Sequence, residues 1–446
     1  MFIRYYYILL YVYIMLLISE KKRIHITVII HFVLWTALTI YIYKFGLLPA
    51  TRLGPTFGIT VVPTESSSMR ITINDFPFWF TFVKKTWLGQ TTVNSGSSVY
   101  SLENHLKVTS DWAGMKLNYA PPLGYSPTMV WVLAPLVVFS PITAYYIFNV
   151  VGLLSIWWQT HPFRCRRGVG LLSFFSILSL ACFQQGQTAL ITGAGLLFIA
   201  EKTRIKNHDD GWRPHIFVGI ALWALTAKPS LALTAIVVLM GLRRWRPLLV
   251  AGVLTILSTL AITSLLGVNW VNDYVHIITS FDKINADVGF FGFAPNHMAN
   301  LRGILSIDFG VPDDIASRIS SIMWFVALLC IVAMGNRTRY SEGAIWSISI
   351  LSYLLFCPHV TSTEELQLVL ILPLCVRPEN KLSWQELVLL GIVPLLPFTS
   401  PAIGLFADNR MVLFIAKISI IIFIAVSMKR TSAYSGAIMT THSGAN

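Results

Sequence analysis

Three cationic side chains that can bind an anion stand out in this apolar chain. Lys228 precedes a proline between two apolar segments, and His297 and Arg302 lie close together in a longer polar stretch. A guanidinium can hold a phosphate through two parallel hydrogen bonds, and a histidine can donate a hydrogen bond or form an ion pair. These residue types predict a phosphate site. The alternatives are that Lys228 extends to a polar surface and that His297 and Arg302 only organise the polar stretch.

Further polar side chains extend this candidate site. His359 follows Pro358 in a short polar turn, where it either contacts a ligand or forms hydrogen bonds within the turn. Gln187 and Asn296 carry amides that can bind the hydroxyl groups of a polar ligand. A glutamine in an apolar segment also commonly joins neighbouring helices.

Several other kinds of site are not indicated by the sequence. There is no Gly-x-x-x-x-Gly-Lys-Ser/Thr phosphate loop, and residues 45–127 contain no Asp-x-Asp pair. The five cysteines lie within or at the ends of apolar runs and form no Cys-x-x-Cys pair, so they predict packing residues. We therefore expect no metal site and no ATP-driven transport.

The elements that must position these residues are predicted to be membrane helices. Apolar residues make up 55% of the chain and charged residues only 12%, with a net charge of +13. Short basic clusters next to apolar runs hold about 19 of the 33 Lys and Arg residues, which places the clusters in the cytoplasm. The net positive charge thus indicates how the chain is oriented in the membrane. Neither a nucleic-acid-binding protein nor a soluble domain is indicated. The clusters lie at 21–23, 164–167, 202–213, 243–246, 337–339, 377–381 and 429–430.

The predicted fold is an all-α, polytopic membrane protein with about 12 transmembrane helices in a single domain, residues 24–430. Residues 431–446 form a cytoplasmic tail. Within residues 1–23, the apolar stretch either is a further span or precedes the true start of the protein. The predicted crossings are 24–44, 128–159, 168–184, 188–200, 216–227, 230–242, 247–266, 319–334, 343–356, 366–376, 384–397 and 411–427.

The lengths of the crossings predict irregularities. Several are shorter than the roughly 20 residues of a full span, so some must extend into polar flanks and others can be half-helices packed inside protein. Segment 128–159 is instead too long for one crossing. Pro135 and Pro141 are expected to kink it or to split off a short interfacial helix.

Two long loops, residues 45–127 and 267–318, are predicted on the extracytoplasmic side, and loops of this length are usually functional. In the first, the aromatic run 74–83 predicts an amphipathic helix at the membrane interface, with Phe and Trp buried and Lys84-Lys85 in water. Asp75 stands at the start of that helix and is either its N-cap or a chemical group of the site. Asp111 is a second candidate carboxylate in the same loop.

Short motifs follow one another in a characteristic order. They are Asp75-Phe76, Tyr125-Ser126-Pro127 before Ala134-Pro135-Leu136, Gly186-Gln187, Lys228-Pro229 with Arg243-Arg244-Trp245-Arg246 after it, Asn296-His297 with Arg302-Gly303, and Cys357-Pro358-His359 with Glu365-Leu366. Together they resemble the motifs of glycosyltransferase family 87, a branch of the GT-C superfamily. The resemblance covers most of the chain from residue 24 onward. Three positions depart from the family pattern, with Ser126 for a second proline, Cys357 for serine and Glu365 for aspartate.

The resemblance implies a GT-C fold and transfer of a sugar from a polyprenyl phosphate to an acceptor, with inversion and with Asp75 as general base. Such a reaction needs a base at the acceptor hydroxyl and cationic groups around the departing phosphate. The residues assigned to the donor phosphate are Lys228, His297, Arg302 and His359, and those assigned to the sugar or acceptor are Asp111, Gln187, Asn296 and Glu365.

The resemblance also implies the sugar, the acceptor and the location of the enzyme. Mannose is the first choice of sugar and arabinofuranose the second, the acceptor is a glycolipid or polysaccharide, and the enzyme lies in the plasma (inner) membrane with its site extracytoplasmic and its C-terminus cytoplasmic. The lipid-linked donor is the expected substrate, and no cofactor is expected. Two alternatives remain open. A carrier for lipid-linked saccharides would place ionisable residues at mid-membrane in both halves, and a structural subunit of a wall-assembly complex would tolerate loss of Asp75.

Overall fold

The computed structural model describes most of the chain between residues 124 and 427 and only a few residues before it. The predicted segments 1–23, 24–44 and 431–446 lie outside the described residues, as does nearly all of 168–184. The described residues are 59–62, 70–73, 124–160, 187–204, 211–266, 269–287, 298–337, 340–360, 362–375, 384–393 and 410–427, with the single positions 76, 80, 83, 84, 87, 100, 107, 179, 182, 295 and 396.

Helices make up almost all of the described structure. Each crossing predicted from residue 188 onward coincides with a helix, which confirms these positions, whereas the total of about 12 spans stays a prediction. These helices are α9 (Ala189–Arg204), α10 (Trp212–Leu225), α11 (Pro229–Gly241), α12 (Trp245–Leu266), α15 (Asp313–Gly335), α16 (Glu342–Phe356), α17 (Leu366–Cys375), α18 (Trp384–Ile392) and α19 (Arg410–Ser427).

Segment 128–159 is broken at its two prolines, as predicted. Helix α5 (Thr128–Leu133) passes into the 3-10 turn η3 (Ala134–Leu136), and α6 (Pro141–Thr160) begins at the second proline. A proline cannot donate the hydrogen bond that a continuous helix needs, but it fits the first turn of a new helix. Of these three elements only α6, with 20 residues, has the length of a membrane span.

The two predicted loops contain secondary structure of their own. In the first, β1 (Ile59–Val62) pairs antiparallel with β2 (Arg70–Ile73), a hairpin of mostly β-branched residues that was not predicted. The second holds α13 (Trp270–Asp287), α14 (Leu301–Gly303) and the π-helical turn η6 (Ile304–Asp308). The described residues of this loop that precede α15 are therefore largely helical.

Long and short helices have different surroundings. Among the described residues, three helices are long and apolar enough to cross a membrane, in α12 (Trp245–Ser264), α15 and α19. Their exposed faces carry large apolar side chains such as Leu260, Phe325 and Ile422, which suit contact with lipid. The shorter helices α11, α16 and α17 are mostly buried. This confirms the expectation that some of the short segments pack inside the protein.

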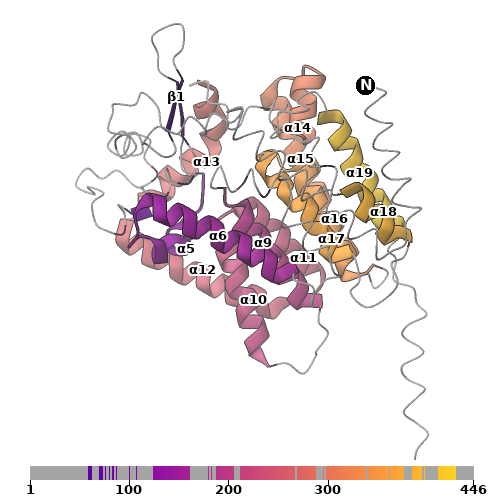
Figure 1. Cartoon of the computed structure of the whole chain (residues 1–446), viewed down its shortest axis with the longest axis horizontal. Helices are drawn as coiled ribbons and strands as arrows, with labels where there is room; N and C mark the ends of the chain where they lie inside the picture. The colour runs from indigo at the N-terminus through magenta and orange to yellow at the C-terminus, as the bar shows by residue number, and fades with distance from the viewer. Residues whose placement is uncertain are drawn as a thin grey trace, which may run out of the picture.

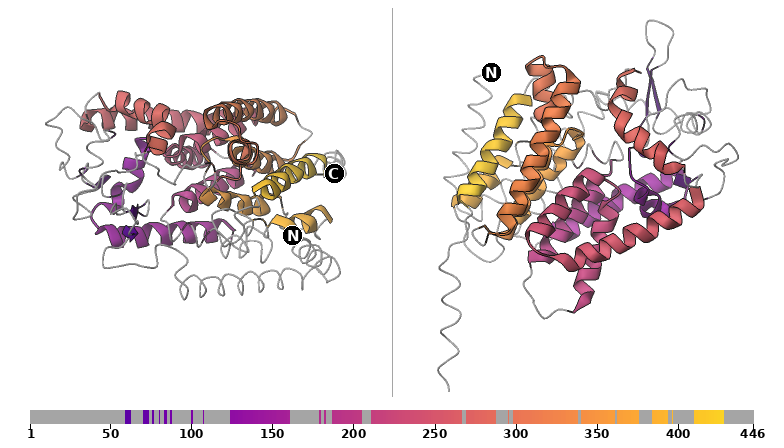
Figure 2. Two further views of the ribbon diagram at one scale, coloured as in Figure 1. Left: turned by 90° about the horizontal axis from the view of Figure 1, so that it is seen from above. Right: turned by 180° about the vertical axis from the view of Figure 1, so that it is seen from behind.

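The described helices form two neighbouring groups, α5 to α12 and α15 to α19 (Figure 1 and Figure 2). Helix α11 packs on α15, and α9 packs on α17, so the groups share one interface. A single hydrophobic core of buried residues from both groups fills this interface.

Helix ends meet at two opposite sides of the molecule. On one side, Arg244 donates to the carbonyl of Thr203 in α9 and to the carboxylate of Glu342 in α16, both at 3.2 Å, and Arg243 donates to the Asn336 side chain after α15 at 3.0 Å. We call this side the basic pole, because it gathers basic clusters that are far apart in sequence. Figure 1 shows β1, α13 and α14 at the other end of the molecule, away from the start of α10.

Candidate functional site

The motif Tyr125-Ser126-Pro127 docks on the turn between α10 and α11. The Ser126 backbone N–H donates to the carbonyl of Ala227 at 3.1 Å, and its hydroxyl donates to the carbonyl of Thr226 at 2.6 Å. The hydroxyls of Thr128 and Thr226 lie 2.9 Å apart. Ser126 thus supplies two of the hydrogen bonds that hold the turn before Lys228-Pro229 in place. We call the end of the molecule that carries Ser126, Lys228 and Arg302 the site pole.

Lys228 is held at the first turn of α11. Its backbone is extended, as expected for a residue before proline, and Pro229 occupies the start of the helix. The ammonium forms an ion pair with Glu364, and the same carboxylate accepts a hydrogen bond from the Tyr353 hydroxyl. The side chain of Lys228 is 15% exposed and that of Glu364 is 3% exposed. The largely buried ammonium of Lys228 is therefore paired with an anion, and this anion is a carboxylate of the protein itself.

Glu365, the next residue, pairs with a different cation. Its carboxylate forms an ion pair with Lys417 of α19, and both side chains are buried, with 1% and 0% exposed. Lys417 also donates to the carbonyl of Ala299 at 2.9 Å. The structure thus engages Glu365, which was assigned to the sugar or acceptor, in a link between α17, α19 and the segment that leads to Arg302.

Asn300 and Arg302 join this segment to the turn after α16. The Asn300 side chain accepts from the Gly303 backbone N–H and donates to the carbonyl of Cys357, both at 2.9 Å. Arg302 donates to the carbonyl of Pro358 at 3.3 Å. Gly303 has no room for a Cβ atom, which would lie 2.2 Å from the carbonyl oxygen of Met298. The close backbone approach explains the glycine in the Arg302-Gly303 motif.

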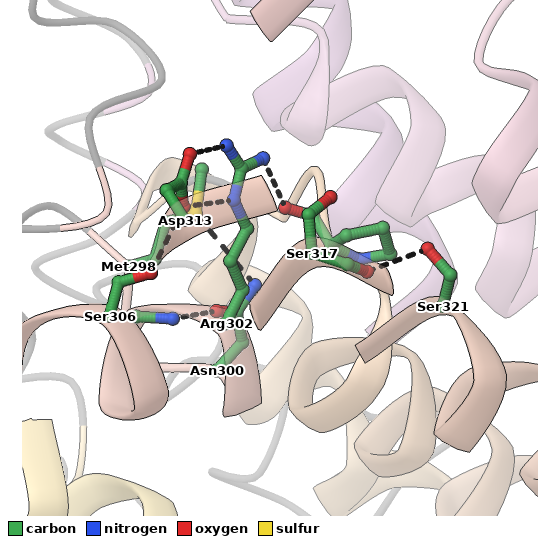
Figure 3. Close-up of polar contacts among 9 residues, drawn as sticks. Met298, Asn300, Arg302, Ser306, Asp313, Ser317 and Ser321 are labelled. Atoms are coloured by element: carbon green, nitrogen blue, oxygen red, sulfur yellow. Dashed lines mark hydrogen bonds and ion pairs between the residues drawn. The ribbon is translucent and has the colours of Figure 1, made fainter. Parts of the chain in front are cut away.

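The guanidinium of Arg302 also pairs with Asp313 at the start of α15. Two hydrogen bonds of 2.9 and 2.6 Å join the two groups, and Ser306 donates to the same carboxylate at 3.0 Å (Figure 3). The Arg302 side chain is 2% exposed and that of Asp313 is 42% exposed. In addition, Arg410 of α19 lies 3.5 Å from Asp308 of η6. Arg302 is therefore a structural centre of the second loop as well as a candidate phosphate ligand.

The described residues of the aromatic segment after Asp75 pack on protein. Phe76 and Phe80 are helical, fully buried and stacked on each other, and Phe76 contacts the rings of Tyr145 and Phe148 in α6. These rings belong to the same buried cluster as Ala227, which adjoins Lys228. The expected burial of the aromatic face is thus against α6. Phe76, Phe80 and Val83 thus belong to a buried cluster that extends to Ala227, the residue before Lys228.

Lys84, Trp87 and Tyr100 form further hydrogen bonds to backbone carbonyls. Lys84, predicted to stay in water, donates to the carbonyl of Phe139 at 2.7 Å. Trp87 donates to the carbonyl of Val130 at 2.9 Å, and Tyr100 to that of Tyr125 at 3.2 Å. Burial first, and the neighbouring Tyr274 second, raise the pKa of Tyr100 well above its ordinary value, so this hydroxyl stays protonated and remains a donor.

The predicted residues that the structure describes gather at the site pole. Lys228 and Arg302 lie in the pairs given above, and His359 is exposed in the turn after Pro358. Gln187 directly precedes Thr188, whose hydroxyl lies 3.4 Å from that of Tyr125. Four predicted residues lie outside the described part of the chain, namely Asp75, Asp111, Asn296 and His297.

Three polar residues of this pole were missed from the sequence, namely Glu364, Asp313 and Tyr353. One signal was available for the first, since Glu364 and Glu365 are adjacent carboxylates next to an apolar helix and require cationic partners. Asp313 and Tyr353 gave no comparable signal. Among the described residues, no group of three or more His, Cys, Asp or Glu side chains could hold a metal ion.

A comparison with models of protein families confirms the resemblance inferred from the motifs. The sequence model of glycosyltransferase family 87 matches residues 123–358, which include Ser126, Lys228 and Arg302. Glu364, Glu365 and Lys417 follow the matched range. No curated protein and no solved structure matches the chain.

Proposed function

The chain belongs to glycosyltransferase family 87, and we propose that it transfers a sugar from a polyprenyl phosphate donor to an acceptor hydroxyl at the site pole. The observation that carries the proposal is the convergence of motifs from distant parts of the chain. Ser126 contacts the turn of Lys228, and Arg302 contacts the turn of Cys357-Pro358 through the Pro358 carbonyl. Such a convergence of cationic and polar groups suits the recognition of a phosphate and a sugar.

The proposed reaction is a direct displacement with inversion. The acceptor hydroxyl oxygen attacks the anomeric carbon, the bond from that carbon to the phosphate oxygen breaks, and its electron pair stays on the phosphate. Asp75 takes the proton of the hydroxyl as general base. Negative charge then grows on the leaving phosphate, where the ammonium of Lys228 and the guanidinium of Arg302 would stabilise it. His297 and His359 are further candidate donors to the phosphate.

The remaining polar residues are proposed to contact the sugar or the acceptor. Gln187 lies beside the contact between Thr188 and Tyr125, and Asn296 precedes the segment of Arg302. Asp111 completes this group, whereas Glu365, which the resemblance assigned to it, is placed outside the direct contacts. Because the buried Glu365 already pairs with Lys417, its proposed contribution is to position the neighbouring Glu364 and the Ala299 segment.

The proposed orientation follows from the charges. The basic pole gathers the residues that the positive-inside rule places in the cytoplasm, so the site pole would face the extracytoplasmic side of the plasma membrane and the C-terminus the cytoplasm. The donor is then a lipid-linked sugar, mannose by preference and arabinofuranose second. The acceptor is a glycolipid or polysaccharide, and no metal cofactor is proposed.

The direct test is sugar transfer by purified protein. Wild type and Asp75→Asn are given a panel of radiolabelled polyprenyl phosphate sugars and an extracted membrane-lipid acceptor pool, with and without EDTA. Glu103→Gln serves as the matched carboxylate control in the same loop, at a position with no proposed role in the site. We expect transfer by wild type, with and without EDTA, and a loss of at least about 100-fold in folded Asp75→Asn. Equal transfer by wild type and Asp75→Asn would reject Asp75 as the base, and absence of transfer in wild type would favour the carrier.

A further inference from the structure

Lys228, the candidate phosphate cation at the turn of α11, is not a bare positive charge. Its ammonium is paired with Glu364, which the Tyr353 hydroxyl holds from a second direction. Tyr353 in turn lies 3.4 Å from the hydroxyl of Ser230 in α11. The carboxylate is therefore fixed beside the ammonium by groups from two helices, while the 15% exposure of the Lys228 side chain leaves it within reach of a ligand.

A phosphate that binds Lys228 must share the ammonium with this carboxylate. In the proposed reaction the donor is a phosphodiester with one negative charge, and the product is a phosphomonoester with a charge of about −1.5 to −2 at pH 7. A fixed carboxylate repels the more highly charged product more strongly. The repulsion is weakly screened because the Glu364 side chain is only 3% exposed.

We propose that Glu364 is a specificity-determining residue of the phosphate site, which disfavours the phosphomonoester product relative to the phosphodiester donor and so promotes product release. The inference rests on the proposed function and deepens it. Arg302 also has a carboxylate partner, but Asp313 is 42% exposed, so solvent screens its effect on a ligand. Glu365 is directed to Lys417 instead. Among the described carboxylates of the site pole, Glu364 is thus the one that is both well buried and paired with an accessible cation.

The test compares the binding of two phosphate esters to the full-length protein in lipid nanodiscs. The probes are geranyl phosphate, a monoester, and its methyl phosphodiester, measured by calorimetry on wild type and Glu364→Gln. Glutamine keeps the size of the side chain and an oxygen that can accept from Lys228 and Tyr353. Glu342→Gln is the matched control, since it removes the carboxylate partner of Arg244 at the basic pole.

In Glu364→Gln we expect the monoester to bind about tenfold more tightly relative to the diester than in wild type. The ratio should stay unchanged in Glu342→Gln. If Glu364→Gln does not fold, Glu364→Asp carries the test, because its shorter carboxylate is set back from Lys228 and should shift the ratio by about threefold in the same direction.

The outcomes separate this inference from the proposed function. If wild type binds both esters but the ratio is the same in the Glu364 variants, or shifts toward the diester, Glu364 has no such role and the transferase proposal is unaffected. If wild type binds neither ester and transfers no sugar, the phosphate site itself is rejected, and this inference with it.

Discussion

Arg302 and Asp313 face each other with two parallel hydrogen bonds, 2.9 Å from Nε to Oδ1 and 2.6 Å from Nη2 to Oδ2. The pair connects the Asn300 segment to the first turn of α15, where a carboxylate is also favoured by the helix dipole. Because Arg302 is buried, its charge depends on this partner. The geometry therefore ties a candidate phosphate ligand to the start of α15, a helix long and apolar enough to cross a membrane.

Replacing Asp313 with Asn is expected to lower the thermal stability of the protein and its sugar transfer together. The substitution removes the carboxylate charge that Arg302 binds through two hydrogen bonds, at a cost of about 2 kcal/mol, since the carboxylate is partly exposed. Asp314→Asn is the control, because this neighbour is exposed in the same helical turn. The measurement compares the melting temperatures of Asp313→Asn and Asp314→Asn in detergent, and we expect the lower value for Asp313→Asn. Equal melting temperatures would show that the pair does not support the fold.

Gly335→Ala is expected to destabilise the packing of α11 on α15. A Cβ atom at Gly335 would lie 2.6 Å from the carbonyl carbon of Gly241, a backbone atom that cannot move aside alone. We expect a loss of about 2 kcal/mol. Gly252→Ala in α12 is the matched control, because a Cβ there meets no atom within 4 Å and alanine favours a helix. Equal melting temperatures of Gly335→Ala and Gly252→Ala would contradict the close approach of the backbones at Gly335 and Gly241.

The buried pair Lys417 and Glu365 is expected to show strong coupling. Lys417→Met or Glu365→Leu alone leaves one buried charge without its partner, which costs about 3–5 kcal/mol, whereas the double replacement costs less than the sum. The measurement is a double-mutant cycle of unfolding in detergent. Additive losses would mean that the two groups do not interact in the folded protein.

If the double variant Lys417→Met/Glu365→Leu folds, its turnover number tests whether this pair also supports the site, in addition to stabilising the fold. Lys417 also holds the Ala299 carbonyl, next to the Asn300 and Arg302 segment. We expect the turnover number to fall while the stability stays close to that of wild type. Unchanged turnover in the folded double variant would limit this pair to a role in stability.

The orientation can be checked by the accessibility of single cysteines. After the five native cysteines have been replaced, Phe309→Cys and Trp212→Cys place exposed thiols at the site pole and next to the basic pole, respectively. A membrane-impermeant maleimide should label Phe309→Cys in intact cells and Trp212→Cys only after permeabilisation. Labelling in the reverse order would invert the proposed topology.

The sequence by itself determined the positions of most helices and the break at Pro135 and Pro141. Apolar length, proline chemistry and the sorting of basic residues act locally, so they can be read along the chain. The same local signals placed Lys228 at the turn between two helices and indicated that its ammonium needs an anion or water. The order of motifs was sufficient to indicate the family that the sequence model matches.

Only the tertiary structure decided which charges meet. Lys228 pairs with Glu364, 136 residues away, and Lys417 reaches both Glu365 and the carbonyl of Ala299. No local pattern encodes such partners, because the free energy that selects them comes from removing two charges from water together. The aromatic segment was likewise assigned to the membrane interface from its composition, whereas the fold buries Phe76 against α6. Burial by lipid and burial by protein favour the same apolar residues, so only the packed structure distinguishes them.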